Sequence, residues 1–174
     1  MDSRKSVDWI RCIGVVCMAI CLLGCPSGQE ETNQIDLIAA PDFTLRTIDG
    51  EEIRLNTFRG KQIVHLTFWA TWCPACLMEI PKLKKLYQAV GDKPFQILSV
   101  GVGVNDSIKK LRSVQEQKQL PYKILFDESG MVSQQYGIMG IPTHIVIDKD
   151  GKVIARFNQL PENPNDYFAQ FSPS

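Results

Sequence analysis

The chain has 174 residues, of which 44% are apolar and 22% charged, enough for one hydrophobic core and too few for two of ordinary size. Its 19 basic and 19 acidic side chains give a formal net charge of zero. This balance creates no extended field of one sign, so nucleic acids and strongly charged ligands are not expected as partners.

The first part of the chain has the pattern of an export signal. Basic residues precede an apolar run from Cys12 to Leu23, which is short for a membrane span of about 20 residues but suits the core of a secretory signal. The run ends in a segment that resembles a bacterial lipobox, with Cys25 as the acylated cysteine. We therefore expect a lipoprotein signal in residues 1–24, a polar linker in 25–39 and one folded domain in 40–174. An uncleaved anchor is the alternative, and either segment would export the domain as a periplasmic or extracytoplasmic protein held at the membrane.

Strand and helix patterns alternate along the domain. Alternating or continuously apolar segments predict strands at 42–46, 51–55, 63–69, 95–104, 122–126, 143–147 and 153–157. Helical spacing predicts helices at 74–90, 106–118 and 166–171, the first of them kinked at Pro81. The order is a hairpin, then βαβαβ, then ββα. We therefore expect an α/β domain with a central mixed β-sheet flanked by helices and an added N-terminal β-hairpin.

Two cysteines are left for chemistry in this domain. The other four lie in the predicted signal or would carry the lipid, which leaves Cys73 and Cys76. A C-x-x-C pair alone could also be half of a zinc site or an inert bridge, but this one joins the apolar segment 63–69 to the helix that begins at Pro74. A helix N-terminus favours a thiolate, so we interpret Cys73 as the nucleophile. Cys76, one turn further on, is then the thiol that resolves a mixed disulfide.

Together the motifs resemble the thioredoxin superfamily, and within it the exported TlpA/ResA-like thiol-disulfide oxidoreductases with an AhpC/TSA-like redoxin domain. The matching segments lie within about residues 40–160: Ala40 to Phe43, Phe68 to Cys76 with Glu79 and Pro81, Gly140 to Thr143, and Ile145 to Asp148. The resemblance implies a thioredoxin-like fold in which Pro142 is a cis-proline that faces the cysteines. With Pro142 in this position, Ile141 would line the substrate groove, and Pro74 is expected to contact the substrate as well. Trp72 is expected to add contact surface as an aromatic beside Cys73, and closing the edge of the core is its alternative role. The resemblance also implies that Glu79 tunes the thiols or passes their protons.

Several polar residues have alternative interpretations. Glu79 could instead be a carboxylate on the solvated face of its helix. Thioredoxin itself has a buried aspartate in the central strand where this chain has Thr67, which shifts proton handling toward Glu79 or water. His65 and His144 lie in predicted strands, where hydrogen-bonded structural histidines are commoner than catalytic ones.

The direction of electron flow is predicted from the residues between the cysteines. Strong exported oxidants of the superfamily have a histidine there that stabilises the reduced thiolate, whereas this chain has Pro74 and Ala75. A less stabilised thiolate releases its electrons more readily, which favours a reductase. We expect a monomeric reductase of protein disulfides, supplied by a membrane thiol donor of the DsbD or CcdA kind. Cytochrome c maturation is a role by analogy alone, and neither a cofactor nor a metal is expected.

Three alternative functions stay open. The same dithiol could act as a thiol oxidase or isomerase. A peroxiredoxin-like peroxidase needs Thr or Ser three residues and Pro seven residues before its cysteine, where Cys73 has Ala70 and Leu66. A non-catalytic lipoprotein that handles copper through its thiols is the third, and it would retain Cu(I) without accelerating the reduction of insulin.

Overall fold

The computed structural model describes residues 38–171, and the predicted signal, Cys25 and the linker up to residue 37 lie outside this range. The strands are β1 (Thr44–Thr47), β2 (Glu52–Arg54), β3 (Ile63–Trp69), β4 (Phe95–Val102), β5 (Ile124–Asp127), β6 (Thr143–Ile147) and β7 (Val153–Phe157). The helices are the short 3₁₀ helix η1 (Leu55–Phe58) and the α-helices α2 (Pro74–Val90), α3 (Ile108–Lys118), α4 (Met131–Gln135) and α5 (Pro164–Phe171). None of these helices is long and apolar enough to cross a membrane.

All seven strands form one mixed sheet in the order β2-β1-β5-β4-β3-β6-β7. The three central strands β3, β4 and β5 pair in parallel, because α2 and α3 return the chain to the same end of the sheet. The remaining pairs are antiparallel, and the β1–β2 hairpin joins the sheet through β5. The expected mixed sheet with an added N-terminal hairpin is therefore confirmed.

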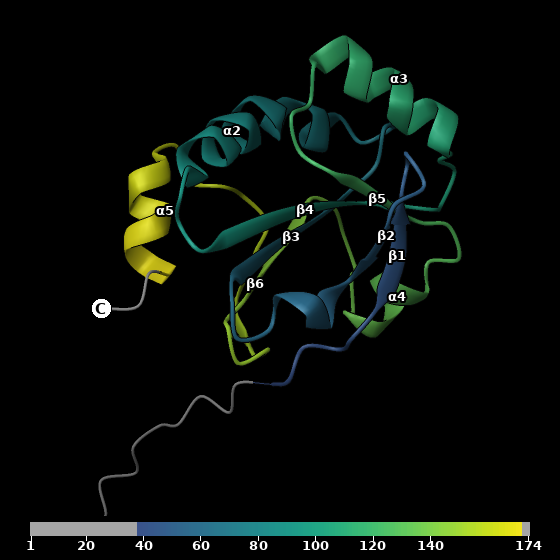
Figure 1. Cartoon of the computed structure of the whole chain (residues 1–174). Helices are drawn as coiled ribbons and strands as arrows, with labels where there is room; N and C mark the ends of the chain where they lie inside the picture. Colours follow the sequence, from purple (N-terminus) through teal and green to yellow (C-terminus); the bar gives the residue numbers. More distant parts are fainter. Residues whose placement is uncertain (1–37, 172–174) are drawn as a thin grey trace, which may run out of the picture. The chain divides into compact units, whose positions relative to one another are not determined.

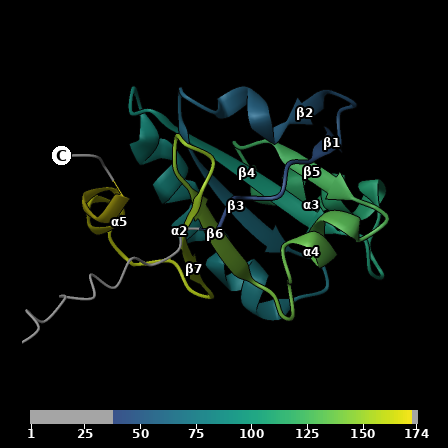
Figure 2. The same ribbon diagram turned by 90° about the horizontal axis from the view of Figure 1, so that it is seen from below.

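Helices cover both faces of this sheet (Figure 1). The helices α2 and α3 lie on one face, with α5 beside α2, and α4 and η1 lie on the other. The view from below shows α4 close to β5, which it contacts (Figure 2). Every residue of β3 is buried, as expected for a parallel strand covered on both faces.

Some predicted boundaries were wrong for local reasons. The helix α2 and the strands β3, β6 and β7 have the predicted bounds, and Pro81 lies inside α2. The helix α3 starts at Ile108 instead of residue 106, because Ser107 caps it by accepting the Lys110 N–H at 3.3 Å. The five-residue helix α4 was not predicted, since it is too short for a helical repeat to show in the sequence.

A row of buried polar residues crosses the sheet beneath α2. Thr67 on β3 is in register with Ser99 on β4 and with His144 on β6. Residues in register on neighbouring strands point to the same face, and His65, two residues before Thr67, shares that face. The sheet therefore presents polar side chains at the place where α2 covers it.

Candidate active site

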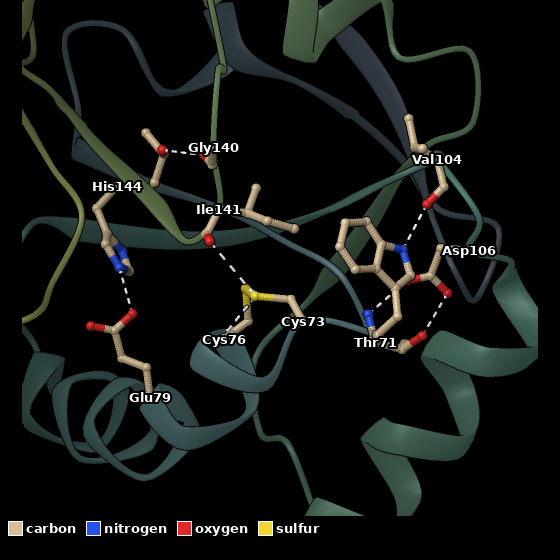
Figure 3. Close-up of a disulfide and its surroundings, with 11 residues drawn as sticks. Thr71, Cys73, Cys76, Glu79, Val104, Asp106, Gly140, Ile141 and His144 are labelled. Carbon is tan, nitrogen blue, oxygen red and sulfur yellow. Dashed lines mark hydrogen bonds and ion pairs between the residues drawn. A yellow bond between two sulfur atoms is a disulfide. The ribbon is translucent and has the colours of Figure 1, made fainter.

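The two cysteines lie at the N-terminus of α2 and are joined by a disulfide (Figure 3). Cys73 is the N-cap residue, and its Sγ accepts the backbone N–H of Cys76 at 3.2 Å. Pro74 occupies the first turn, where its missing N–H costs little. The Cα atoms of the two cysteines are 5.3 Å apart, so the bond closes within one helical turn. Because an N–H of the helix already points at Cys73 Sγ, the same group can stabilise a thiolate there once the disulfide opens.

The loop before β6 faces the disulfide. The Ile141–Pro142 peptide is cis, as predicted from the resemblance. The carbonyl oxygen of Ile141 lies 3.7 Å from Cys73 Sγ. Thr143 stabilises this loop by donating its hydroxyl to the carbonyl of Gly140 at 2.7 Å. The structure thus brings Cys73 together with Ile141 and Pro142, although 68 positions separate Cys73 from Ile141 in the sequence.

Asp106 anchors the loop that precedes Cys73, and sequence reasoning missed this residue. Its carboxylate accepts the backbone N–H of Thr71 at 2.7 Å and the Thr71 hydroxyl at 3.0 Å (Figure 3). Next to this contact, the indole N–H of Trp72 donates to the carbonyl of Val104 at 2.7 Å. An aspartate just before a helix suggested only a helix start, because its long-range partner has no signal in the local pattern.

Glu79 points from α2 toward β6 (Figure 3). Its side chain is only 11% exposed, so the alternative of a solvated carboxylate is wrong. One carboxylate oxygen accepts the Nε2–H of His144 at 2.8 Å, and the other accepts the backbone N–H of Leu160 at 2.5 Å. Burial raises the pKa of Glu79, but the hydrogen bond and charge of His144, the Leu160 N–H and the charge of Lys82 outweigh it and hold this pKa below its usual value.

Both histidines are fully buried and hydrogen-bonded, as expected for structural histidines. His65 Nδ1 lies 2.6 Å from the Tyr167 hydroxyl, and His65 Nε2 lies 2.9 Å from Thr67 Oγ1 and 3.1 Å from His144 Nδ1. Burial, and then the charge of His144, lower the pKa of His65 well below its ordinary value. Sequence reasoning did not foresee that His144 reaches Glu79, since 65 residues separate them.

A small internal cavity connects Cys76 with this polar network. It has about 10 Å³ of free volume, close to the room that one water molecule needs. Cys76, Glu79 and His144 line it, together with Trp69 and Ser99 among others. Within residues 38–171, the Trp69 indole N–H and the Ser99 hydroxyl are buried without a hydrogen-bond partner. The cavity therefore offers polar groups between the deeper cysteine and Glu79.

The surface around the disulfide is largely apolar and exposed. Trp72 is 50% exposed, Met78 on α2 is 74% exposed, and Met139 before the cis peptide is 98% exposed. The open groove that Met78 lines also includes Ala75 and Pro142, and polar side chains complete it, namely Glu79, Lys82, Asn158 and Gln159. Exposed apolar side chains that surround a reactive group are typical of a surface that contacts another protein.

The comparisons with known proteins agree with this geometry. Residues 38–156 match the AhpC/TSA family. The thiol-disulfide oxidoreductase ResA of Bacillus thuringiensis subsp. konkukian is 33% identical over 136 residues, which make up 77% of each chain. ResA of Geobacillus thermodenitrificans is 39% identical over 114 residues, 66% of this chain and 64% of that one. The thioredoxin domain of a thiol-disulfide oxidoreductase from Bacteroides vulgatus has a TM-score of 0.68 at 26% identity, with 77% of this chain and 96% of that chain covered.

The fold and the helix-capping cysteine pair define a thioredoxin-like thiol-disulfide oxidoreductase. More particularly, the chain belongs to the AhpC/TSA family and is a thiol-disulfide oxidoreductase of the ResA type.

Proposed function

We propose that this oxidoreductase is an exported reductase of protein disulfides, tethered to the outer face of a bacterial membrane by a lipid on Cys25. The observation that carries the catalytic part is the Cys73–Cys76 disulfide at the N-terminus of α2, with the Ile141 carbonyl 3.7 Å from Cys73 Sγ. The tether is supported by the basic and apolar pattern of residues 1–24 and by the polar linker 25–39.

The reaction consists of two thiol–disulfide exchanges. The Cys73 thiolate attacks one sulfur of a client disulfide R–S–S–R′, and R′–S⁻ leaves and takes up a proton. Cys76 then gives up its proton and attacks Cys73 Sγ, and R–S⁻ leaves as the enzyme disulfide forms. Two electrons pass to the client, which ends as two thiols. Glu79 accepts the Cys76 proton, since both residues line one cavity, and delivers it to the second leaving group.

The client is a protein segment held against the apolar surface around Cys73. Trp72 and Pro74 flank Cys73 along the chain, and the cis Ile141–Pro142 peptide brings the Ile141 carbonyl to Cys73 Sγ. Neither Pro74 nor Ala75 brings a charge that would stabilise the reduced thiolate, which favours electron donation. In an oxidising compartment, a membrane thiol donor then has to restore the dithiol. Apocytochrome c is one client class consistent with this chemistry.

Trapping of clients tests the catalytic part. In cells, the Cys76→Ser variant should accumulate mixed disulfides between Cys73 and client proteins, because the resolving thiol is missing. The Cys73→Ser variant, which keeps one thiol, is the matched control and should trap almost nothing. An empty trap with Cys76→Ser would contradict a role on proteins.

A Cys25→Ser variant tests the tether separately. This variant should not incorporate radioactive palmitate and should no longer sediment with the membrane fraction. Its rate of insulin reduction should not change. Equal membrane association of the Cys25→Ser variant and the unmodified chain would overturn lipid anchoring without affecting the catalytic proposal.

A further inference from the structure

A chain of hydrogen bonds extends from Glu79 on α2 across one face of the sheet to α5. It starts at the Glu79 carboxylate, continues through His144 and His65, and ends at the hydroxyl of Tyr167 on α5, with links of 2.8, 3.1 and 2.6 Å. Thr67 Oγ1 lies beside the central link, 2.9 Å from His65 Nε2 and 3.1 Å from His144 Nδ1. Four elements, α2, β6, β3 and α5, therefore contribute to one buried polar network.

One arrangement of protons that satisfies these groups runs from Tyr167 to Glu79. An ionised Glu79 can only accept, so His144 donates to it through Nε2–H. Burial lowers the pKa of His65 and raises that of Tyr167, so His65 is neutral and Tyr167 keeps its proton. Tyr167 can then donate to His65 Nδ1, and His65 Nε2–H can donate to His144. In this arrangement every polar atom of the hydrogen-bonded network has a partner when the Glu79 carboxylate is charged.

We propose that His144 is a positioning residue for Glu79: it holds the carboxylate ionised at the cavity of Cys76 and shares the proton that Cys76 releases. The inference rests on the proposed function, in which Cys76 resolves the mixed disulfide. Glu79 is one helical turn beyond Cys76, and His144, Glu79 and Cys76 line the same cavity. Without its partner, a carboxylate buried to this degree would bind a proton more tightly, so a smaller fraction of it would be ionised at a given pH.

The proton balance of the resolving step follows from this arrangement. Cys76 loses its proton as its sulfur bonds to Cys73 Sγ, and the proton goes to the Glu79–His144 pair. The pair gains one proton, and its net charge rises by one unit. When R–S⁻ leaves Cys73, it takes this proton and becomes R–SH, and the pair returns to its starting state.

Other titratable groups face the pair from the packed elements. Lys82 lies on the same helix as Glu79 and forms an ion pair with Glu162 at 2.6 Å. Tyr122 lines the cavity, and burial raises its pKa, so it stays neutral. His65 faces His144 from β3, and Tyr167 faces His65 from α5; burial keeps His65 and Tyr167 uncharged. Glu79 is therefore the cavity carboxylate expected to exchange a proton in the resolving step.

A single-turnover experiment separates the two exchanges. The reduced enzyme is mixed in excess with a peptide disulfide whose halves carry different fluorophores. Release of the first half reports the attack of Cys73, and release of the second half reports resolution by Cys76. In His144→Leu, the second release should slow, and more so at lower pH, because the buried carboxylate loses the hydrogen bond that lowers its pKa and a larger fraction of Glu79 is protonated. The first release should keep its rate.

The pH profile distinguishes positioning from a merely structural role. Without His144 the acidic limb of the second release should move to higher pH, because Glu79 must lose a more tightly bound proton. His144→Gln, which keeps an amide donor for the carboxylate but cannot carry a proton, should move this limb less than His144→Leu. In a Glu79→Gln background, His144→Leu should change nothing further, since it acts through Glu79.

The controls make each outcome decisive. Ile145→Val changes a buried neighbour on the opposite face of β6 and should leave both releases unchanged. If the unmodified enzyme releases neither half, the proposed function fails. If it releases both and the His144 variants have the same pH profile, only the role of His144 is overturned. Equal slowing of both releases would also overturn it, and His144→Gln decides the matter if His144→Leu does not fold.

Discussion

Replacing Asp106 with alanine should weaken the domain and misplace Cys73 at the same time. The change removes the two hydrogen bonds that tie Asp106 to Thr71, at 2.7 and 3.0 Å, two residues before the nucleophile. Because Asp106 is half-buried, water can hydrogen-bond to the Thr71 groups that lose their partner. Each lost bond therefore lowers the free energy of unfolding by only about 1 kcal/mol. The expected loss is about 2 kcal/mol, which lowers Tm by about 4–8 °C in a domain of this size.

The same variant should reduce insulin more slowly, on the order of tenfold, since a small displacement of a reacting group has a large effect on rate. Thermal unfolding of the oxidised protein and insulin turbidity measure the two effects. Asp49→Ala is the matched control: it removes a carboxylate that is 62% exposed and pairs with Arg112 at 2.7 Å, and such a pair contributes less than about 1 kcal/mol. If Asp106→Ala melts and reacts like Asp49→Ala, the loop contact has no role in placing Cys73.

Two further predictions concern packing and pH. Gly103→Ala should destabilise the domain by about 3 kcal/mol in urea unfolding, because the new Cβ would overlap the backbone carbonyl oxygens of Glu128 and, at 2.6 Å, of Asp127. Gly140→Ala, where the added Cβ would have no other atom within 4 Å beyond its chain neighbours, should cost little, and equal losses would contradict the argument. Glu79→Gln should cost more stability at pH 7 than at pH 3: the folded pKa of Glu79 is lowered, so its contribution is present above about pH 4.3 and is lost as pH falls through the folded value. A stability difference that is the same at both pH values would show that this ionisation is not coupled to folding.

Much of the architecture follows from local patterns in the sequence. The continuously apolar segment Ile63–Trp69 marks a strand covered on both faces, and the bounds of α2 follow from Pro74 and from helical spacing up to Val90. Short elements were harder to predict. The helix α4 has five residues, fewer than two turns, and therefore leaves no periodic signal.

The sequence by itself determined the redox pair, because C-x-x-C at a strand-to-helix junction depends only on neighbours along the chain. Only the tertiary structure decided which polar residues meet around it. The antiparallel register of β3 and β6 sets Thr67 opposite His144, and α2 then lays Glu79 over that pair. Such contacts join residues 65 or more positions apart, and they depend on strand register and helix packing, which the whole core specifies and no local pattern encodes.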